Sequence, residues 1–99
     1  MNELRIPPQD NDAERGVLGS CLLDPPRMDN ISLDPAEFYA PKHQALWESL
    51  CEMRNSNQGM DAITISTWLK DRGELEKVGG YDYLVELQDS TIVSAHSQH

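Results

Sequence analysis

The sequence predicts an all-α fold, an orthogonal bundle of about five or six short helices that forms a single domain over residues 1–99. Three observations support this prediction. Apolar residues recur at the spacing of an amphipathic helix, residues that start or end helices separate those segments, and no alternating apolar–polar run of useful length indicates a strand. With 99 residues, 38% of them hydrophobic, the chain is long enough for one core.

An extended lead-in over residues 1–9 precedes the first predicted helix. The run Ile6-Pro7-Pro8 keeps this segment out of helix, because proline restrains the residue before it to extended backbone. The helix is expected to begin at Asn11, since Asn11 and Glu14 have the spacing of a capping box.

The first helix has an apolar face at helical spacing, made of Ala13, Val17, Leu18, Cys21 and Leu22. Gly16 and Gly19 lie on its other side. Each glycine costs about 1 kcal/mol relative to alanine, which suggests that another element packs closely there. The run Asp24-Pro25-Pro26 ends the helix.

Two short elements and the best amphipathic helix follow. Pro26 to Ile31 predicts a helical turn, and Asp34-Pro35-Ala36-Glu37 is typical of a helix start. Phe38-Tyr39 is interpreted as a buried aromatic plug. The helix from about Pro41 to Arg54 has two faces. Its apolar face carries Leu46, Trp47, Leu50, Cys51 and Met53, and its polar face carries Lys42, Glu48, Ser49 and Glu52.

A polar loop over residues 55–59 leads to a helix that Thr64 is expected to cap and Gly73 to end. The inward side chains of this helix are Ile65, Trp68 and Leu69. Glu74 to Val78 is expected to form one or two turns, which Gly79-Gly80 breaks.

The last predicted helix covers Tyr81 to about Gln88, with Tyr83, Leu84 and Leu87 inward. Residues 90–99 are expected to start a linker or the next helix, in a chain that continues in the intact protein.

The charge balance argues against direct binding to nucleic acid. Seventeen acidic residues against eight basic ones give a net charge of −9. Affinity for a phosphate backbone requires clustered lysine and arginine. Here Lys42, Arg54, Lys70, Arg72 and Lys77 are scattered singly. No apolar run is long enough to span a membrane and no secretory signal is present, so a cytoplasmic location is expected.

No motif in the sequence is expected to hold a nucleotide or a metal. A nucleotide motor needs G-x-x-x-x-G-K-[ST], whereas Gly79-Gly80 is followed by Tyr81-Asp82. Asp10, Asp12 and Glu14 alternate like the start of a calcium loop, but Arg15 stands where that loop needs glycine.

The cysteines and the internal histidine are expected to be structural. Cys21 and Cys51 are interpreted as buried thiols that act as small hydrophobic residues. His43 falls within the apolar arc of its helix and is expected to be a hydrogen-bonded core residue. With no catalytic residue, cofactor site or metal site assigned, the chain is predicted to be a protein-interaction module and not an enzyme.

Three blocks of sequence, in order, resemble DnaB-type replicative helicases. The first block is Arg5-Ile6-Pro7-Pro8 followed by Ala13-Glu14-x-x-Val17-Leu18-Gly19 and Leu22-Leu23-Asp24. The second is Phe38-Tyr39-x-x-x-His43-x-x-Leu46-Trp47. The third runs from Asp61-x-Ile63-Thr64 through Gly73-x-Leu75 to Val78-Gly79-Gly80-x-x-Tyr83-Leu84-x-x-Leu87. Together they span residues 5–87.

The resemblance implies an N-terminal collar domain above a hexameric motor ring. In the family this region helps to order the hexamer and belongs to the part engaged by primase and sometimes by a helicase loader. The resemblance also implies that the intact protein is an ATP-dependent 5′–3′ DNA helicase that uses ATP and Mg²⁺ in a motor domain absent from residues 1–99. The sequence departs from the family pattern in two ways. The helical hairpin that the family uses for subunit pairing is missing here. Thr67 stands where the family has a capping glutamate after Thr64.

A helix-turn-helix DNA-binding regulator is the alternative, drawn from Thr64–Arg72, a glycine turn and Glu74–Val78. The acidic second element argues against it. On the last helix Tyr81 and Val85 lie off the inward face, four residues apart. They are the predicted protein interface, because tyrosine is enriched at binding surfaces.

Overall fold

The computed structural model describes residues 11–57, 59 and 61–96, which form an all-α fold, as predicted. The α-helices are α1 (Asn11–Leu23), α2 (Pro41–Asn55), α3 (Ala62–Asp71) and α4 (Gly80–His96). Short 3-10 helices lie between them: η1 (Pro25–Asn30), η2 (Pro35–Glu37) and η3 (Glu76–Val78). The described segments include no strand. The extended lead-in expected over residues 1–9 lies outside the described residues.

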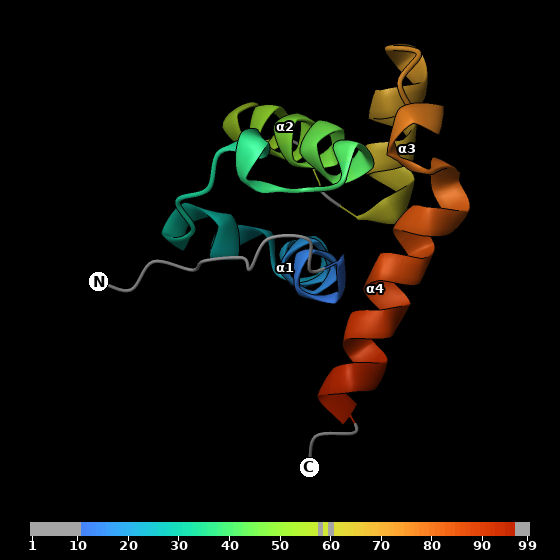
Figure 1. Cartoon of the computed structure of the whole chain (residues 1–99). Coiled ribbons are helices and arrows are strands. Elements are labelled where there is room, and N and C mark those ends of the chain that lie inside the picture. Colours follow the sequence, from blue (N-terminus) through green and yellow to red (C-terminus); the bar gives the residue numbers. More distant parts are fainter. Residues whose placement is uncertain (1–10, 58, 60, 97–99) are drawn as a thin grey trace.

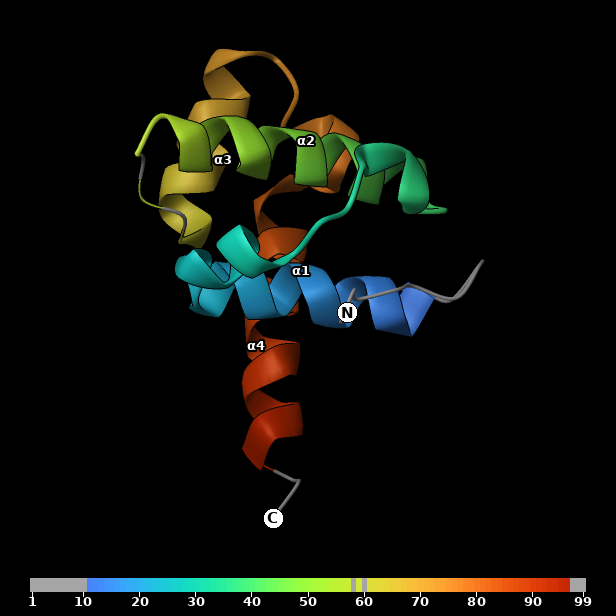
Figure 2. The ribbon, with the colours of Figure 1, turned by 90° about the vertical axis from the view of Figure 1, so that its left-hand side faces the viewer.

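The helices cross steeply, which confirms the predicted orthogonal bundle. α1 and α2 lie one above the other, and α4 runs across both (Figures 1 and 2). α4 packs against α1 where the two helices cross and against α3 near its own start. No helix in the described part of the chain is long and apolar enough to cross a membrane.

The core lies where the helices meet, and most of it follows the predicted helix faces. Its largest fully buried apolar side chains are Leu18, Phe38, Leu46, Trp47, Leu50, Met53, Ile65, Leu69, Leu84 and Leu87. The Phe38 and Trp47 rings lie 5.5 Å apart between centroids, and the Trp47 indole N–H donates to the Leu33 carbonyl at 2.9 Å. This bond satisfies the one polar group that the buried indole carries.

Glycine and proline end the elements where the sequence predicts. Pro25 begins η1 directly after α1. At the end of α3, Gly73 has φ +70° and its N–H donates to the Lys70 carbonyl, while the N–H of Glu74 donates to the Leu69 carbonyl. This is the Schellman arrangement, which satisfies carbonyls at a helix end.

The last turn before α4 requires glycine. Gly79 has φ +108°, and a Cβ there would lie 2.9 Å from the Tyr83 Cβ. A side chain at this position would therefore strain the backbone and collide with α4.

Several sequence predictions are wrong in detail. Tyr39 is 61% exposed, whereas Phe38 is buried. Phe38 is extended, and neighbouring side chains of an extended chain point to opposite sides, so the two rings do not share the core. Ser49 is buried, and it lies one turn before buried Met53, on the same side of α2. Cys51 is only half-buried, at the edge of the core.

The boundaries of α3 and α4 also differ from the prediction. Asp61, and not Thr64, is the N-cap of α3, since its carboxylate accepts the Thr64 N–H at 2.8 Å. Thr67 consequently lies in the helix interior, where its hydroxyl donates to the Ile63 carbonyl. α4 continues to His96 and not to about Gln88, because no glycine or proline follows Gly80 to end it. Residues 90–96 thus extend α4 and do not start a separate element.

Candidate protein interface

The carboxylate of Glu14, in the first turns of α1, is fully buried and points at the start of α2. It accepts hydrogen bonds from the backbone N–H groups of Tyr39 and Ala40, the latter at 3.4 Å. Ala40 is the N-cap of α2 and has no side chain that could cap the helix. Glu14 therefore caps α2 across space by binding the N-cap amide, as the N3 carboxylate of a capping box does, and the helix dipole also favours a negative charge there.

The predicted capping box between Asn11 and Glu14 at the start of α1 is consequently wrong, because the Glu14 carboxylate binds at the start of α2 instead. The sequence carried a signal for this role. Glu14 lies three, four and seven residues before Val17, Leu18 and Cys21, so it shares the apolar face of α1. A carboxylate on such a face must find buried hydrogen-bond donors.

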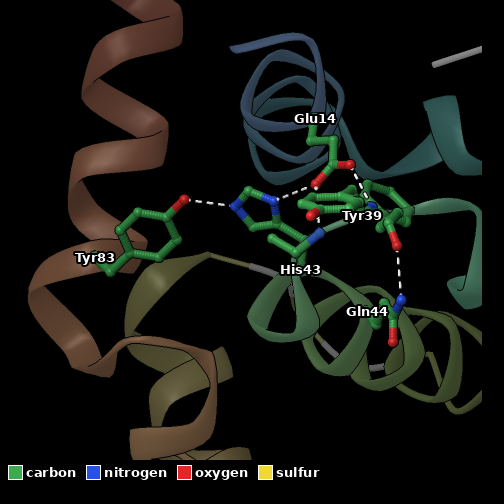
Figure 3. A network of polar contacts seen from close by, with 7 residues as sticks. Glu14, Tyr39, His43, Gln44 and Tyr83 are labelled. Atoms are coloured by element: carbon green, nitrogen blue, oxygen red, sulfur yellow. Dashed lines mark hydrogen bonds and ion pairs between the residues drawn. The ribbon is translucent and has the colours of Figure 1, made fainter. Parts of the chain in front are cut away.

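His43 extends this network from α2 to α4 (Figure 3). Its side chain is fully buried, with Nδ1 2.7 Å from Glu14 Oε1 and Nε2 2.6 Å from the Tyr83 hydroxyl. A neutral imidazole satisfies both contacts when Nδ1–H donates to Glu14 and Nε2 accepts from Tyr83. The prediction that His43 is a hydrogen-bonded core residue is confirmed.

Tyr83 completes the connection at the edge of the core. Its ring stacks on His43 at an interplanar angle of 17° and carries the Lys42 ammonium 3.9 Å from its centroid. Burial raises the pKa of the Tyr83 phenol, so at neutral pH the hydroxyl keeps the proton that it donates. Arg15 of α1 forms an ion pair with Glu86 of α4 at 2.9 Å. Polar contacts thus fix α4 against α1 and α2.

The predicted interface residues lie on α4, on either side of Tyr83 in the sequence. Tyr81 is 44% exposed, whereas Val85 is half-buried and packs against the core. Tyr81 therefore provides most of the apolar surface of the pair. The side chains of Asp82 and Glu86, next to them on α4, are exposed. The result is one aromatic ring on an acidic surface of α4, a helix that the contacts of Tyr83 hold against α2.

The geometry does not favour the helix-turn-helix alternative. The element expected over Glu74–Val78 contains only the three-residue 3-10 helix Glu76–Val78. A recognition element must lie along the major groove and present several side chains to the bases. A single acidic turn is too short for this role.

The cysteines and acidic residues form no metal site in the part of the chain that the structure describes. Cys21 and Cys51 are both free thiols. Burial raises the pKa of Cys21 to about 11 and also raises the pKa of Cys51. Both thiols therefore stay protonated at neutral pH, a form that is a poor nucleophile and a poor metal ligand.

Comparison with known proteins identifies the family. The model of the DnaB-like helicase N-terminal domain matches residues 6–99. The replicative DNA helicase DnaB of Geobacillus stearothermophilus is 35% identical over 104 residues, which cover 100% of this chain and 23% of that protein. The replicative DNA helicase DnaB of Synechocystis is 36% identical over 89 residues, which cover 88% of this chain and 10% of that protein.

A solved structure agrees with the sequence matches. The crystal structure of the N-terminal domain of DnaB helicase from Mycobacterium tuberculosis superimposes with a TM-score of 0.78 at 35% identity, over 85% of this chain and 61% of that one. The chain spans about a quarter or less of the length of the two helicases described above. It belongs to the family of DnaB-like helicase N-terminal domains, the N-terminal part of replicative DNA helicases.

Proposed function

We propose that this domain is the non-catalytic interaction and assembly part of a hexameric replicative DNA helicase. In the whole protein it supports the organisation of the ring and contacts primase and a helicase loader during DNA replication. ATP-dependent 5′–3′ unwinding, with its ATP and Mg²⁺, belongs to a motor domain outside residues 1–99.

The observation that carries this proposal is the combined match of sequence and fold to the N-terminal domain of DnaB, at 35% identity and a TM-score of 0.78. Two features of the chain support it. The sequence contains no phosphate-binding loop, and its net charge of −9 repels nucleic acid. A domain with these properties contributes to a helicase through contacts with proteins.

Binding experiments on the 99-residue chain test the choice between protein and nucleic-acid partners. Fluorescence anisotropy should detect binding to primase from the same replication system, and no binding to duplex DNA between 50 and 200 mM salt, the range in which phosphate contacts lose roughly 10³–10⁵ in affinity. Saturable DNA binding whose affinity falls steeply with salt, without primase binding, would contradict the proposal.

Within this function, we propose Tyr81 with the edge of Val85 as a contact between helicase subunits. Tyr81 lies in the first turn of α4, where a negative charge is favourable to the helix. The substitution Tyr81→Glu should therefore leave the helix intact and place a carboxylate on the contact surface.

In the complete helicase, Tyr81→Glu should weaken hexamer assembly in sedimentation velocity and leave the helical content of the 99-residue chain unchanged by circular dichroism. The matched control is Ile63→Glu, at a 65% exposed apolar position in the first turn of α3, which should leave assembly unchanged. If Tyr81→Glu unfolds the chain, or if the hexamer resists it as well as the control, Tyr81 is not a subunit contact.

A further inference from the structure

A groove runs along the outer side of the first half of α2. It encloses about 440 Å³, and its apolar lining consists of Pro35, Ala36, Pro41 and Ala45. The α2 residues of the groove lie on the side of that helix opposite Leu46 and Leu50, and η2 lies beside the first turns of α2 (Figure 2). The volume lies within the usual range of small-ligand pockets, roughly 300–1,000 Å³, so the groove has room for a bulky apolar side chain.

Two opposite charges stand at this groove. Glu48 comes from α2 and Lys77 from η3, and both residues are exposed. Neither has an ion-pair partner among the described residues. An occupant that complements the groove therefore combines an apolar body with a hydrogen-bond donor for Glu48 and an anion for Lys77.

We propose that Tyr81 of a second copy of this chain binds in the groove. This binding rests on the subunit contact proposed for Tyr81 above and names the surface that receives the ring. Tyr81 is 44% exposed and does not line the groove of its own chain. Its ring is the apolar body and its hydroxyl is the donor, since a tyrosine side chain combines the two. The hydroxyl donates to Glu48 of the receiving copy.

Asp82 supplies the anion for Lys77 of the receiving copy. It follows Tyr81 in the first turn of α4, is exposed, and has no ion-pair partner among the described residues. Glu86, the other carboxylate beside Tyr81, is already paired with Arg15 of its own chain. Because each copy carries a net charge of −9, two copies repel each other unless opposite charges meet where they touch. The ion pair between Asp82 and Lys77 meets this requirement and orients the ring.

The contact joins two different surfaces of the chain. Each copy gives one ring from α4 and receives one ring beside α2. A contact between unlike surfaces can repeat from copy to copy and close into a ring of subunits. One aromatic anchor with one ion pair is small beside the roughly 1,000 Å² that a stable interface needs, so the contact acts within the assembled helicase.

Cross-linking of the complete helicase tests where the ring binds. The double variant Tyr81→Cys/Ala45→Cys carries one thiol on α4 and one in the groove, and a short bismaleimide spans the space that the Tyr81 ring vacates. A denaturing gel should show a ladder of covalent species from dimer to hexamer. Each single variant should give no more cross-linked product than the unmodified protein, because burial keeps Cys21 and Cys51 protonated. Monomers alone would overturn the contact, and dimers alone would overturn its repeat from copy to copy.

Charge reversal tests the ion pair. Lys77→Glu places a carboxylate opposite Asp82 and should shift the dissociation of the hexamer, followed by native mass spectrometry on dilution, to higher protein concentration. Adding Asp82→Lys in the same chain should reverse this shift. Lys70→Glu makes the same charge change at an exposed position of α3 outside the groove and should have no effect. Failure of the double variant to recover would overturn the pairing of Lys77 with Asp82.

The groove and the subunit contact fail in different ways. If Tyr81→Glu weakens the hexamer while cross-linking and charge reversal have no effect, Tyr81 contacts another surface of the neighbouring subunit, and the groove is not its site. If Tyr81→Glu also leaves the hexamer unchanged, the subunit contact itself fails.

Discussion

At the residue scale, Glu14 and His43 show how a small domain keeps two ionisable side chains in its core. Each polar atom of these two side chains has a partner, because Glu14 accepts from two backbone amides and the imidazole, and His43 also contacts Tyr83. The network joins α1, α2 and α4, which are far apart in sequence. Breaking it leaves the remaining groups buried without partners, which costs more than the bonds themselves contribute.

We expect His43→Ala to lower the free energy of unfolding by about 1–3 kcal/mol, since it leaves the Glu14 carboxylate and the Tyr83 hydroxyl without their shared partner. Urea denaturation measures this change. Glu48→Ala, at an exposed position of the same helix, should stay within about 0.5 kcal/mol of the unmodified chain.

Partner affinity per folded molecule should be unchanged in His43→Ala, because the imidazole lies inside the domain. A variant of unchanged stability that no longer binds its partner would show instead that His43 belongs to an interface.

At the scale of the helix, the ends of the elements decide the fold as much as their faces do. α3 begins with a side-chain cap from Asp61 and ends with a Schellman turn at Gly73. α2 has no cap of its own and receives one from Glu14 of α1. A local cap stabilises one helix, whereas the cap from Glu14 also fixes how two helices pack.

Asp61→Ala should lower the free energy of unfolding by about 1 kcal/mol, the usual value of an N-cap. Asp71→Ala, at the last position of α3, removes a carboxylate from the unfavourable end of the helix dipole and should not destabilise the domain. Thermal or urea denaturation of the two variants gives a direct comparison.

The effect of Asp61 should depend on pH. Hydrogen bonds from the Thr64 backbone N–H lower the pKa of Asp61, so its folded pKa lies below its unfolded value of about 3.9. The stabilisation is therefore complete above that unfolded value and is lost as pH falls through the folded pKa. The difference between the unmodified chain and Asp61→Ala should vanish in acid, and a difference that persists there would argue against a charged cap.

At the scale of the whole molecule, periodicity predicted the all-α fold and most buried faces, because side chains three and four residues apart share a helix surface. Contacts between distant segments could not be predicted in this way. The Glu14 cap joins residues that are 26 positions apart, and only the apolar position of the carboxylate indicated it. Tyr39 was predicted to be buried together with Phe38 but is exposed, because adjacent side chains of an extended segment point to opposite sides. The Tyr81 and Val85 interface stays a prediction.

The 99-residue chain should be a monomer or a weak dimer. A stable interface needs on the order of 1,000 Å² or more, whereas the contact proposed above consists mainly of the single exposed ring of Tyr81. Sedimentation equilibrium at micromolar concentration measures the state, and a stable hexamer of the isolated chain would contradict this expectation.

The central proposal is that residues 1–99 stabilise the hexamer of the complete helicase. The most direct test is native mass spectrometry of the complete helicase and of the same protein lacking residues 1–99, diluted in parallel. We predict that the shortened protein dissociates from hexamers to smaller species at higher protein concentration than the complete one. An identical hexamer fraction for the two proteins at every dilution would contradict the account.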